Sequence, residues 1–485
     1  MNITLHDYRT DPALTQKDGV NLAHENIGSL MRTAANEQTE VVFHDFNKLL
    51  TDSDYAKEIL DNADLVISNV GPHAHYYFYL RARYGFNYRI LRDVRTAIWS
   101  SYLLQEYLCA PLLRPKDLLM VASHYTHALY EKMFPHLKQS LVFRCYPLTV
   151  NFPQVLPPVQ VQRPQPSTTV LGYVGRLSED KNFPQIVSAL IALNLSGKGH
   201  FKLLACGDIH SDSCDPAVIA TNVRQVLGEG DFFEYLPARS NHAIWEVYRS
   251  VDVLVFPSTS NLETLGRVLI EASYAELPVV CGAHAAAPEL VPPASLCGVD
   301  YVLEKTFSAH GDHRLGTLDL ADMINVIASK SFETPSCFST YHNDTERFLR
   351  VVSSPPDELT RNSELGGEMN LSGVFANNPQ LNLEKTQLQF IHSLNVTLPS
   401  PTNSAVAQQT IEQLIPWFLG LQAPQQSTKL KALHQRLLTL SQYKERTARF
   451  IDKSGATRGD FTNVGGIDIE LCHIAKFYPS FCLEK

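Results

Sequence analysis

The chain has 485 residues, of which 44% are hydrophobic and 19% are charged, and its formal net charge is -9. This composition is typical of a globular protein and excludes a chain that is disordered throughout. The length exceeds what one hydrophobic core organises, so we expect two domains. The negative charge gives no electrostatic footprint for nucleic acid, whose binding needs a clustered surplus of Lys and Arg, although local basic groups can still hold a small phosphate ligand.

The apolar runs and the cysteines bear on the compartment. No run reaches the roughly 18 to 20 apolar residues of a membrane-spanning helix, and the first residues lack a basic segment followed by an apolar one. Nine cysteines are scattered from Cys109 to Cys482 without a C-x-x-C pair, which favours reduced thiols over disulfides or a zinc site. We expect a cytoplasmic protein, and peripheral contact with a membrane that carries a lipid acceptor is compatible with the charge.

Short apolar runs alternate with stretches of helical period over residues 1–150, which predicts strand-helix units of a Rossmann-like α/β domain. Residues 151–169 are rich in proline and predict an extended linker. Over residues 170–330 the alternation is sharper and predicts a second Rossmann-like domain. Residues 331–485 predict an irregular insert and a partly helical C-terminal extension, with helical period at 405–419 and 429–451. The expected fold class is α/β, with two doubly wound domains facing a cleft.

In the second domain five strands and four helices are expected in alternation. The strands are Val170–Val174, Phe201–Cys206, Phe232–Leu236, Val253–Phe256 and Pro278–Cys281, and the helices are Pro184–Leu195, Asp215–Leu227, Asn241–Ser250 and Thr264–Tyr274. In open parallel sheets ligands bind beyond the carboxyl ends of the strands. The loops that follow these strands are therefore the places to look for chemistry.

The loop after the first strand of the second domain reads G-R-L-S-E-D-K from Gly175 to Lys181. Gly175 lets the backbone approach a ligand, Arg176 offers a planar fork for phosphate oxygens, and Lys181 adds a mobile point charge. Together the two cations can neutralise a diphosphate. Taken alone, the same pattern also fits a surface loop with two solvated cations.

A second motif, P-S-T-S-N-L-E-T-L-G-R-V-L-I-E, follows the apolar strand that ends at Phe256 and carries Glu263 and Glu271. On one continuous helix the two carboxylates would lie roughly 12 Å apart along the axis, within reach of one ligand of nucleotide-sugar length. Glu263 also fits a plain partner for the helix dipole, whereas Glu271 stands in an apolar stretch and suits ribose hydroxyls. We expect free backbone N–H groups at the helix start to bind a diphosphate; their residues are Thr264, Leu265 and Gly266.

The ordered set of motifs resembles the second domain of the retaining glycosyltransferases of family 4, which have the GT-B fold of two Rossmann-like domains. The set comprises G-x-x-G-R-x-x-x-x-K, the L-x-x-x-G-D turn at 203–208, the P-S-x-x-x-x-E-x-L-G block, the paired glutamates, and P-V-V followed by A-A-P-E-L. The resemblance implies that Arg176 and Lys181 bind the diphosphate, that Glu263 contacts donor-sugar hydroxyls and that Glu271 holds the ribose. The strand end at Leu236 would line the base. Glu276 departs from the family, which usually has glycine there.

In the first domain the resemblance is diffuse. Gly19 corresponds to the glycine loop near the N-terminus, and His73 and His75 lie where the acceptor side is expected. The family's His-Asp pair is replaced by Arg92 and Asp93, so Asp93 is a candidate acceptor contact, and a salt-bridged loop is the alternative. Two histidines without a carboxylate or thiolate at metal spacing do not define a metal site.

The resemblance implies transfer of a sugar, with retention of configuration, from a nucleoside-diphosphate sugar to an acceptor hydroxyl. The acceptor would be a glycan, a lipid-linked molecule or a small molecule. The resemblance also implies that the leaving diphosphate is stabilised by Arg176, Lys181 and helix N–H groups, and that no metal or other cofactor takes part. Two alternatives stay open: a GT-B nucleotide-sugar epimerase, and a catalytically degenerate nucleotide-sugar-binding protein. No lysine motif for the pyridoxal phosphate of a phosphorylase is recognised.

Overall fold

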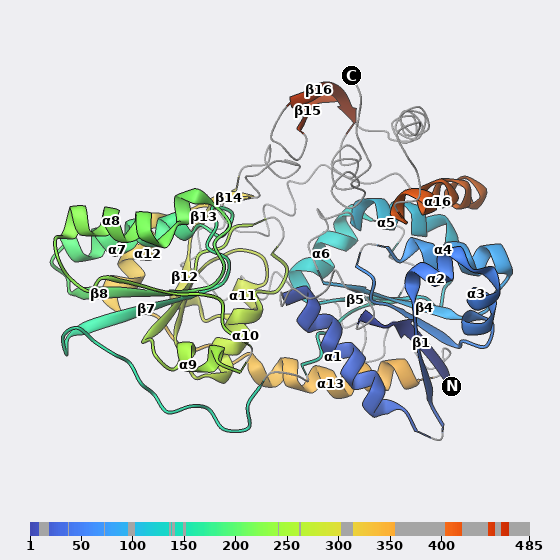
Figure 1. Cartoon of the computed structure of the whole chain (residues 1–485), viewed down its shortest axis with the longest axis horizontal. Helices are drawn as coiled ribbons and strands as arrows, with labels where there is room; N and C mark the ends of the chain where they lie inside the picture. Colours follow the sequence, from blue (N-terminus) through green and yellow to red (C-terminus); the bar gives the residue numbers. More distant parts are fainter. Residues whose placement is uncertain are drawn as a thin grey trace.

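The structure is a computed structural model of the chain (Figure 1). Two α/β bodies lie side by side, and segments from the second half of the chain return to the first body. The described residues are 1–8, 19–36, 38–71, 73–95, 102–134, 137, 141–148, 152–240, 242–260, 263–301, 314–354, 403–419, 445–451 and 457–464.

The first domain is built on a six-stranded sheet in the order β2-β1-β3-β4-β5-β6, and every neighbouring pair is parallel. The strand order reverses beside β1, which is the doubly wound pattern that places ligand sites at the carboxyl ends of the strands. The strands are β1 (Asn2–His6), β2 (Glu40–His44), β3 (Leu65–Ser68), β4 (Arg89–Val94), β5 (Leu118–Val121) and β6 (Leu141–Arg144).

Helices cover both faces of this sheet, so its strands are buried and apolar. Helix α1 packs on one face, where Ile27 and Met31 meet Leu5 and Leu91. The other face carries α4, α5 and α6. The helices are α1 (Gly19–Ala34), α2 (Phe46–Thr51), α3 (Ser53–Leu60), α4 (His75–Tyr84), α5 (Tyr102–Cys109), the 3-10 turn η3 (Ala110–Leu112) and α6 (His124–Met133).

The second domain has another six-stranded sheet, in the order β12-β11-β10-β7-β8-β9, again with every neighbouring pair parallel. Its order reverses between β7 and β10, which are neighbours in the sheet but far apart in the chain. The strands are β7 (Thr168–Val174), β8 (His200–Cys206), β9 (Phe233–Leu236), β10 (Val253–Phe256), β11 (Val279–Gly282) and β12 (Leu296–Cys297).

Helices α7, α8 and α12 cover one face of the second sheet, and α9 and α10 cover the other. Aspartates cap the N-termini of two of these helices: Asp215 accepts backbone N–H groups at the start of α8, and Asp319 accepts a backbone N–H group at the start of α12. The helices are α7 (Phe183–Leu195), η5 (Asp212–Cys214), α8 (Pro216–Leu227), α9 (Ile244–Tyr248), α10 (Arg267–Tyr274), α11 (Ala287–Leu290), η6 (Pro293–Ser295) and α12 (Leu320–Ser329), and a hairpin pairs β13 (Val299–Tyr301) with β14 (Gly316–Leu318).

The predicted fold class of two doubly wound α/β domains is confirmed, and the nine elements expected from Val170 to Cys281 all occur. The expected helix Thr264–Tyr274 begins three residues later, at Arg267. The first residues of that prediction form a turn instead.

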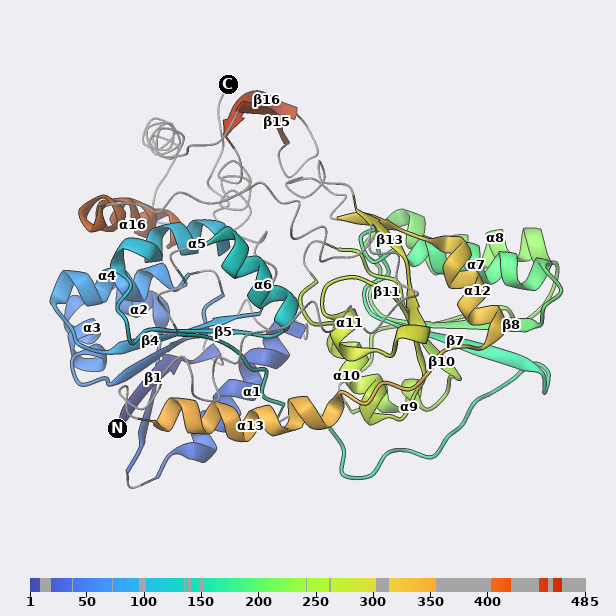
Figure 2. The ribbon, with the colours of Figure 1, turned by 180° about the vertical axis from the view of Figure 1, so that it is seen from behind.

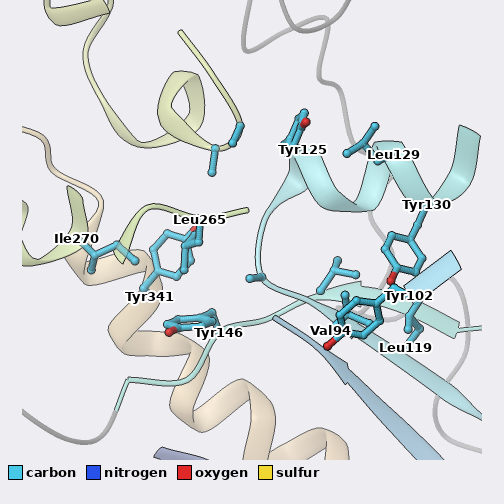
Figure 3. Packing of buried hydrophobic residues seen from close by; sticks show 14 of the residues in the cluster. Val94, Tyr102, Leu119, Tyr125, Leu129, Tyr130, Tyr146, Leu265, Ile270 and Tyr341 are labelled. Carbon is cyan, nitrogen blue, oxygen red and sulfur yellow. The ribbon is translucent and has the colours of Figure 1, made fainter. Parts of the chain in front are cut away.

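Helix α13 (Phe338–Ser353) leaves the second domain and packs against the first, beside α1 (Figure 2). Arg144 at the end of β6 donates to both carboxylate oxygens of Asp344 at 2.5 and 2.7 Å. One hydrophobic cluster continues across the two domains: Tyr146 and Tyr341 lie beside Leu265 and Ile270 (Figure 3). The domains are therefore joined by a returning helix as well as by the connection at 152–167.

The connection at 152–167 carries no helix or strand, as its prolines predict, and Val155 is 83% exposed. Residues of the C-terminal extension return to the first domain, where α16 (Ser404–Phe418) packs against α4 and α5. The helical period at 405–419 is thus matched by a helix. The helical period at 429–451 is contradicted at its end, where strand β15 (Glu445–Ile451) pairs antiparallel with β16 (Thr457–Val464). Residues 420–444 lie outside the described part.

Candidate functional site

The candidate site lies where the strand order of the second sheet reverses. The loop after β7 begins at Gly175, whose φ is +150°, and its N–H donates to Cys206 O at 3.0 Å. The loop after β8 begins at Gly207, where an added Cβ would lie 1.8 Å from Gly175 O. The two backbones therefore touch, and only glycine fits at Gly207.

Arg176 and Lys181 both lie in the loop after β7. Arg176 pairs with Asp180 at 3.1 Å and its side chain is 42% exposed, so its guanidinium stays open to a ligand. The Tyr173 hydroxyl donates to Arg176 O at 2.5 Å and anchors the loop from beneath. Burial raises the pKa of Asp180, but hydrogen bonds and the nearby cations outweigh it and hold the pKa below its usual value.

Lys181 forms an ion pair with Glu263, which comes from the loop after β10. The Ser258 hydroxyl also donates to the Glu263 carboxylate, at 3.1 Å. Burial raises the pKa of Glu263, yet Lys181 and these donors lower it below the usual range, so the carboxylate is charged. The structure thus brings Lys181, expected at the diphosphate, into contact with Glu263, expected at the donor sugar, and Arg176 lies on the same loop as Lys181.

Two residues that sequence reasoning missed hold these loops together. Asn182 has a φ of +54°, and its side-chain N–H group donates to Pro257 O at 2.8 Å and to the Thr259 hydroxyl at 2.9 Å. His284, in the loop after β11, contacts Ser260 O through Nε2 at 2.8 Å. Burial lowers the pKa of His284 to about 4, so the ring is neutral and donates to this carbonyl. The sequence signal that could have identified Asn182 and His284 is their position in the loops that follow strands β7 and β11.

The turn before α10 differs from the expected helix start. Gly266 has a left-handed backbone, with φ at +73°, and Thr264 and Leu265 precede it in the turn. Glu263 and Glu271 are therefore not on one continuous helix, which corrects that expectation. The backbone N–H groups of Thr264, Leu265 and Gly266 do not form the first helical turn, because α10 starts only at Arg267.

Glu271 lies within α10 with its side chain 12% exposed. Arg267 donates to one carboxylate oxygen at 2.8 Å, and the Tyr248 hydroxyl donates to the other at 2.6 Å. Both oxygens are thus oriented by the second domain itself. A carboxylate oxygen has more than one lone pair, so each can still accept from a ligand hydroxyl.

Leu236, the expected base contact, ends β9 beside the loop of Gly207. Leu236 O accepts from the Gly207 N–H at 3.1 Å, and the Tyr235 hydroxyl donates to Gly207 O at 2.9 Å. Leu236 therefore lies at the same sheet edge as Gly175, on the far side of β7 from Glu263.

The acceptor-side histidines do not lie with the donor-side residues. His75 begins α4 with a relative exposure of 2%, and His73 precedes that helix in a turn. The ring of Phe418 from α16 is 4.9 Å from that of His73, so the C-terminal extension packs over this position. Burial lowers the pKa of His73 to about 4.

Asp93 lies inside β4, is 5% exposed and pairs with Arg95. Burial raises its pKa, against the influence of Arg95. Arg92 points to the opposite face, where it pairs with Glu106 in the interior. Both Arg92 and Asp93 thus form ion pairs, as the alternative of a salt-bridged loop predicts, although these ion pairs are buried and do not face solvent. Gly19 begins α1.

Two other residues near the carboxyl edge of the first sheet, Tyr8 and His24, carried no sequence signal. The rings of Tyr8 and His24 stack with centroids 3.8 Å apart, and His24 Nδ1 is 3.5 Å from the guanidinium of Arg95. Arg95 O accepts from the Thr264 hydroxyl at 3.0 Å. The carboxyl edges of the two sheets therefore meet at Arg95 and Thr264.

No group of three or more His, Cys, Asp or Glu side chains among the described residues could hold a metal ion. No helix in the described ranges combines the length and the apolar character needed to cross a bilayer.

Residues 160–304 match the family Glycosyl transferases group 1. This range contains β7 to β12 and therefore all the donor-side candidates described above. The match to this family therefore falls within the second domain.

A segment of 117 residues is 32% identical to the D-inositol 3-phosphate glycosyltransferase of Stackebrandtia nassauensis; it covers 24% of this chain and 26% of that protein. The match therefore spans about a quarter of that relative.

Similar solved structures include the Anabaena protein HepE in complex with UDP, with 16% identity, a TM-score of 0.45 and coverage of 73% of this chain and 96% of that one. Sucrose-phosphate synthase from Thermosynechococcus elongatus has 15% identity and a TM-score of 0.49, with coverage of 73% and 94%. The fold assignment itself follows from the two strand orders.

Proposed function

We propose that this protein is a glycosyltransferase that moves a sugar from a nucleoside-diphosphate sugar to an acceptor hydroxyl. The observation that carries the proposal is the pairing of Lys181 with Glu263 across the strand-order reversal of the second sheet, with Arg176 open beside it. The match of this segment to the group 1 glycosyltransferases supports the same reading.

The two cations have the role of stabilising the leaving diphosphate. Negative charge develops on the oxygen that departs from the sugar, and fixed cations beside that oxygen lower the barrier. Arg176 offers an exposed planar fork. Lys181 offers a point charge, and its ion-pair partner changes from Glu263 to a phosphate oxygen when the donor binds. In this proposal these residues supply the required positive charge, and no metal or other cofactor takes part.

The two glutamates have the role of orienting the donor. Glu263 accepts from hydroxyls of the transferred sugar once Lys181 turns to the diphosphate, and Ser258 keeps its carboxylate in place. Glu271 accepts from the ribose hydroxyls, with its oxygens aimed by Arg267 and Tyr248. Leu236 lies by the base.

The finer assignment is to the retaining enzymes of family 4, and the motif order from Gly175 to Glu271 supports it. The acceptor, a glycan, a lipid-linked molecule or a small molecule, would approach from the carboxyl edge of the first sheet. Its hydroxyl must reach the sugar on the face that the diphosphate leaves for configuration to be retained.

The test is release of nucleoside diphosphate from a panel of nucleotide-sugars, with and without candidate acceptors. We expect release with one donor and its loss in Arg176→Ala, Lys181→Ala and Glu271→Ala. Glu179→Gln is the matched control, because Glu179 is an exposed carboxylate in the same loop. Unchanged turnover in Arg176→Ala and Glu271→Ala would overturn the site assignment.

Two further measurements test the retention of configuration and the independence from metal. The anomeric configuration of the product, measured by proton NMR, should match that of the donor. Turnover should persist in excess EDTA. Binding of a nucleotide-sugar without release under any acceptor would favour a degenerate binding protein, and conversion of the donor to its epimer would favour an epimerase.

A further inference from the structure

The two domains meet at a small set of hydrogen bonds, which we call the interdomain junction. It consists of Ser123, His124 and Tyr125 of the first domain with Thr264 and Glu289 of the second. The Glu289 carboxylate accepts from the backbone N–H of His124 at 3.0 Å and from that of Tyr125 at 2.6 Å. These are the first two residues of α6, which has ten residues.

The junction has a second point of contact. Ser123 caps α6 by accepting from the Thr126 N–H at 3.2 Å, and its hydroxyl donates to Thr264 O at 2.8 Å. Thr264 follows Glu263 directly in the chain and also donates to Arg95 O. The start of α6 is therefore bonded to the backbone beside a proposed sugar-binding carboxylate.

The junction is partly buried, with His124 and Glu289 at intermediate exposure. Tyr125 and Leu265 are 1% and 5% exposed, and Figure 3 shows them on the facing elements of the two domains. The first N–H groups of a helix have no partner within the helix, and its positive dipole end favours a carboxylate. Two hydrogen bonds, one to each oxygen of the Glu289 carboxyl group, fix the direction of this contact. Glu289 thus binds, across the domain boundary, two N–H groups of α6 in addition to the Thr126 N–H that the helix's own cap, Ser123, accepts.

We propose that Glu289 is a positioning residue for sugar transfer: by binding the N-terminus of α6, it holds the first domain against the turn that carries Glu263. This inference rests on the proposed function. Glu289 lies outside the donor-side residues and touches neither Lys181 nor Arg176 in the described contacts. Its loss should leave binding of the nucleoside diphosphate intact, while it disturbs the step that needs both domains in register.

The test uses Glu289→Gln in the full chain. Glutamine keeps the size of the side chain but places an amide N–H group against one of the two backbone N–H donors, so one bond is lost. Asp215→Asn is the matched control, because Asp215 accepts two N–H groups at the start of α8 within the second domain. Both variants lose helix-cap bonds, and only Glu289→Gln changes the junction.

We expect Glu289→Gln to lower kcat about tenfold or more, in line with loss of one hydrogen bond that leaves a backbone donor unsatisfied, while the Kd for the nucleoside diphosphate stays within about twofold. Small-angle X-ray scattering should show a larger radius of gyration in Glu289→Gln and no change in Asp215→Asn. Ser123→Ala, which removes the second contact, should lower kcat in the same direction.

An unchanged kcat together with an unchanged radius of gyration in Glu289→Gln would overturn the inference. Equal losses of kcat in Glu289→Gln and Asp215→Asn would also overturn it, since a general stabilising role would suffice. Failure of the proposed function is distinct, because the wild type would then release no nucleoside diphosphate from any donor. The scattering comparison would still decide whether Glu289 holds the domains together.

Discussion

Lys181 and Glu263 form an ion pair between the loops after β7 and β10, at the point where the second sheet reverses its strand order. Their side chains are 18% and 13% exposed. In the absence of a ligand, each neutralises the other. A bound diphosphate must therefore compete with Glu263 for the lysine.

Glu263→Gln should bind nucleoside diphosphates more tightly and turn over more slowly. Removal of the carboxylate frees the charge of Lys181, and we expect affinity to rise several-fold, up to about tenfold. Titration calorimetry with the diphosphate released in the donor assay measures this. Glu179→Gln, in the same loop but exposed, should bind as the wild type does. Weaker binding in Glu263→Gln would contradict competition.

Gly207→Ala should disturb the donor loop. Its Cβ would lie 1.8 Å from Gly175 O, so the loop that begins at Gly175 and carries Arg176 must move. We expect diphosphate affinity to fall at least about tenfold, with a stability loss of about 2 kcal/mol or more. Gly228→Ala is the control: its φ is also positive, at +83°, but nothing lies within 4 Å of an added Cβ. Similar affinities in the two variants would contradict this account.

Glu289 should make stability depend on pH. Burial raises its pKa to about 7, against the backbone N–H groups of Tyr125 and His124 and the charge of Arg144. Tyr341 faces the same carboxylate from α13. Because the pKa is raised in the folded state, the contribution of the Glu289 carboxyl group to the free energy of unfolding is complete below the ordinary pKa of about 4.5. This contribution is lost as the pH rises through about 7, by up to about 3 kcal/mol.

The measurement is the difference in unfolding free energy between the wild type and Glu289→Gln at pH 5, 6, 7 and 8. Because other groups titrate alike in both proteins, the difference isolates Glu289. We expect the wild type to lose stability relative to the variant as pH rises. A difference that does not change over this range would show that the carboxyl group has its ordinary pKa.

Glu276→Gly should stabilise the protein. Helix α10 ends in a Schellman motif, in which the Leu277 N–H donates to Ala272 O at 2.9 Å and the Glu276 N–H donates to Ser273 O. Glu276 has a φ of +54°, where a side chain is unfavourable. We expect a gain of about 0.5 to 1 kcal/mol, measured as a rise in Tm. Glu276→Ala keeps the side-chain penalty and should show no gain.

The sequence was most informative in the second domain. Buried parallel strands form short apolar runs, and the helices between them have their own period, so the elements from Val170 to Cys281 could be placed along the chain. The start of α10 was the exception. Gly266 takes a left-handed conformation that ends the turn before the helix, and a glycine inside an apolar pattern does not reveal its φ.

The first domain was less predictable because its candidate residues depend on what packs over them. His73 lies beneath Phe418, which is more than three hundred residues away in the chain, and Asp93 faces Arg95 inside the fold. Burial by distant segments leaves no local pattern. The stacking of Tyr8 on His24 has the same origin.

The sequence by itself determined the two α/β domains, the proline-rich connection, and the loops that carry Arg176, Lys181, Glu263 and Glu271, because these depend on local periodicity and on residue chemistry. Only the tertiary structure decided that Lys181 meets Glu263, that Arg267 and Tyr248 orient Glu271, and that Glu289 binds the start of α6. The physical reason is that a doubly wound sheet makes neighbours of strands far apart in the chain, and a returning helix fixes one domain against the other.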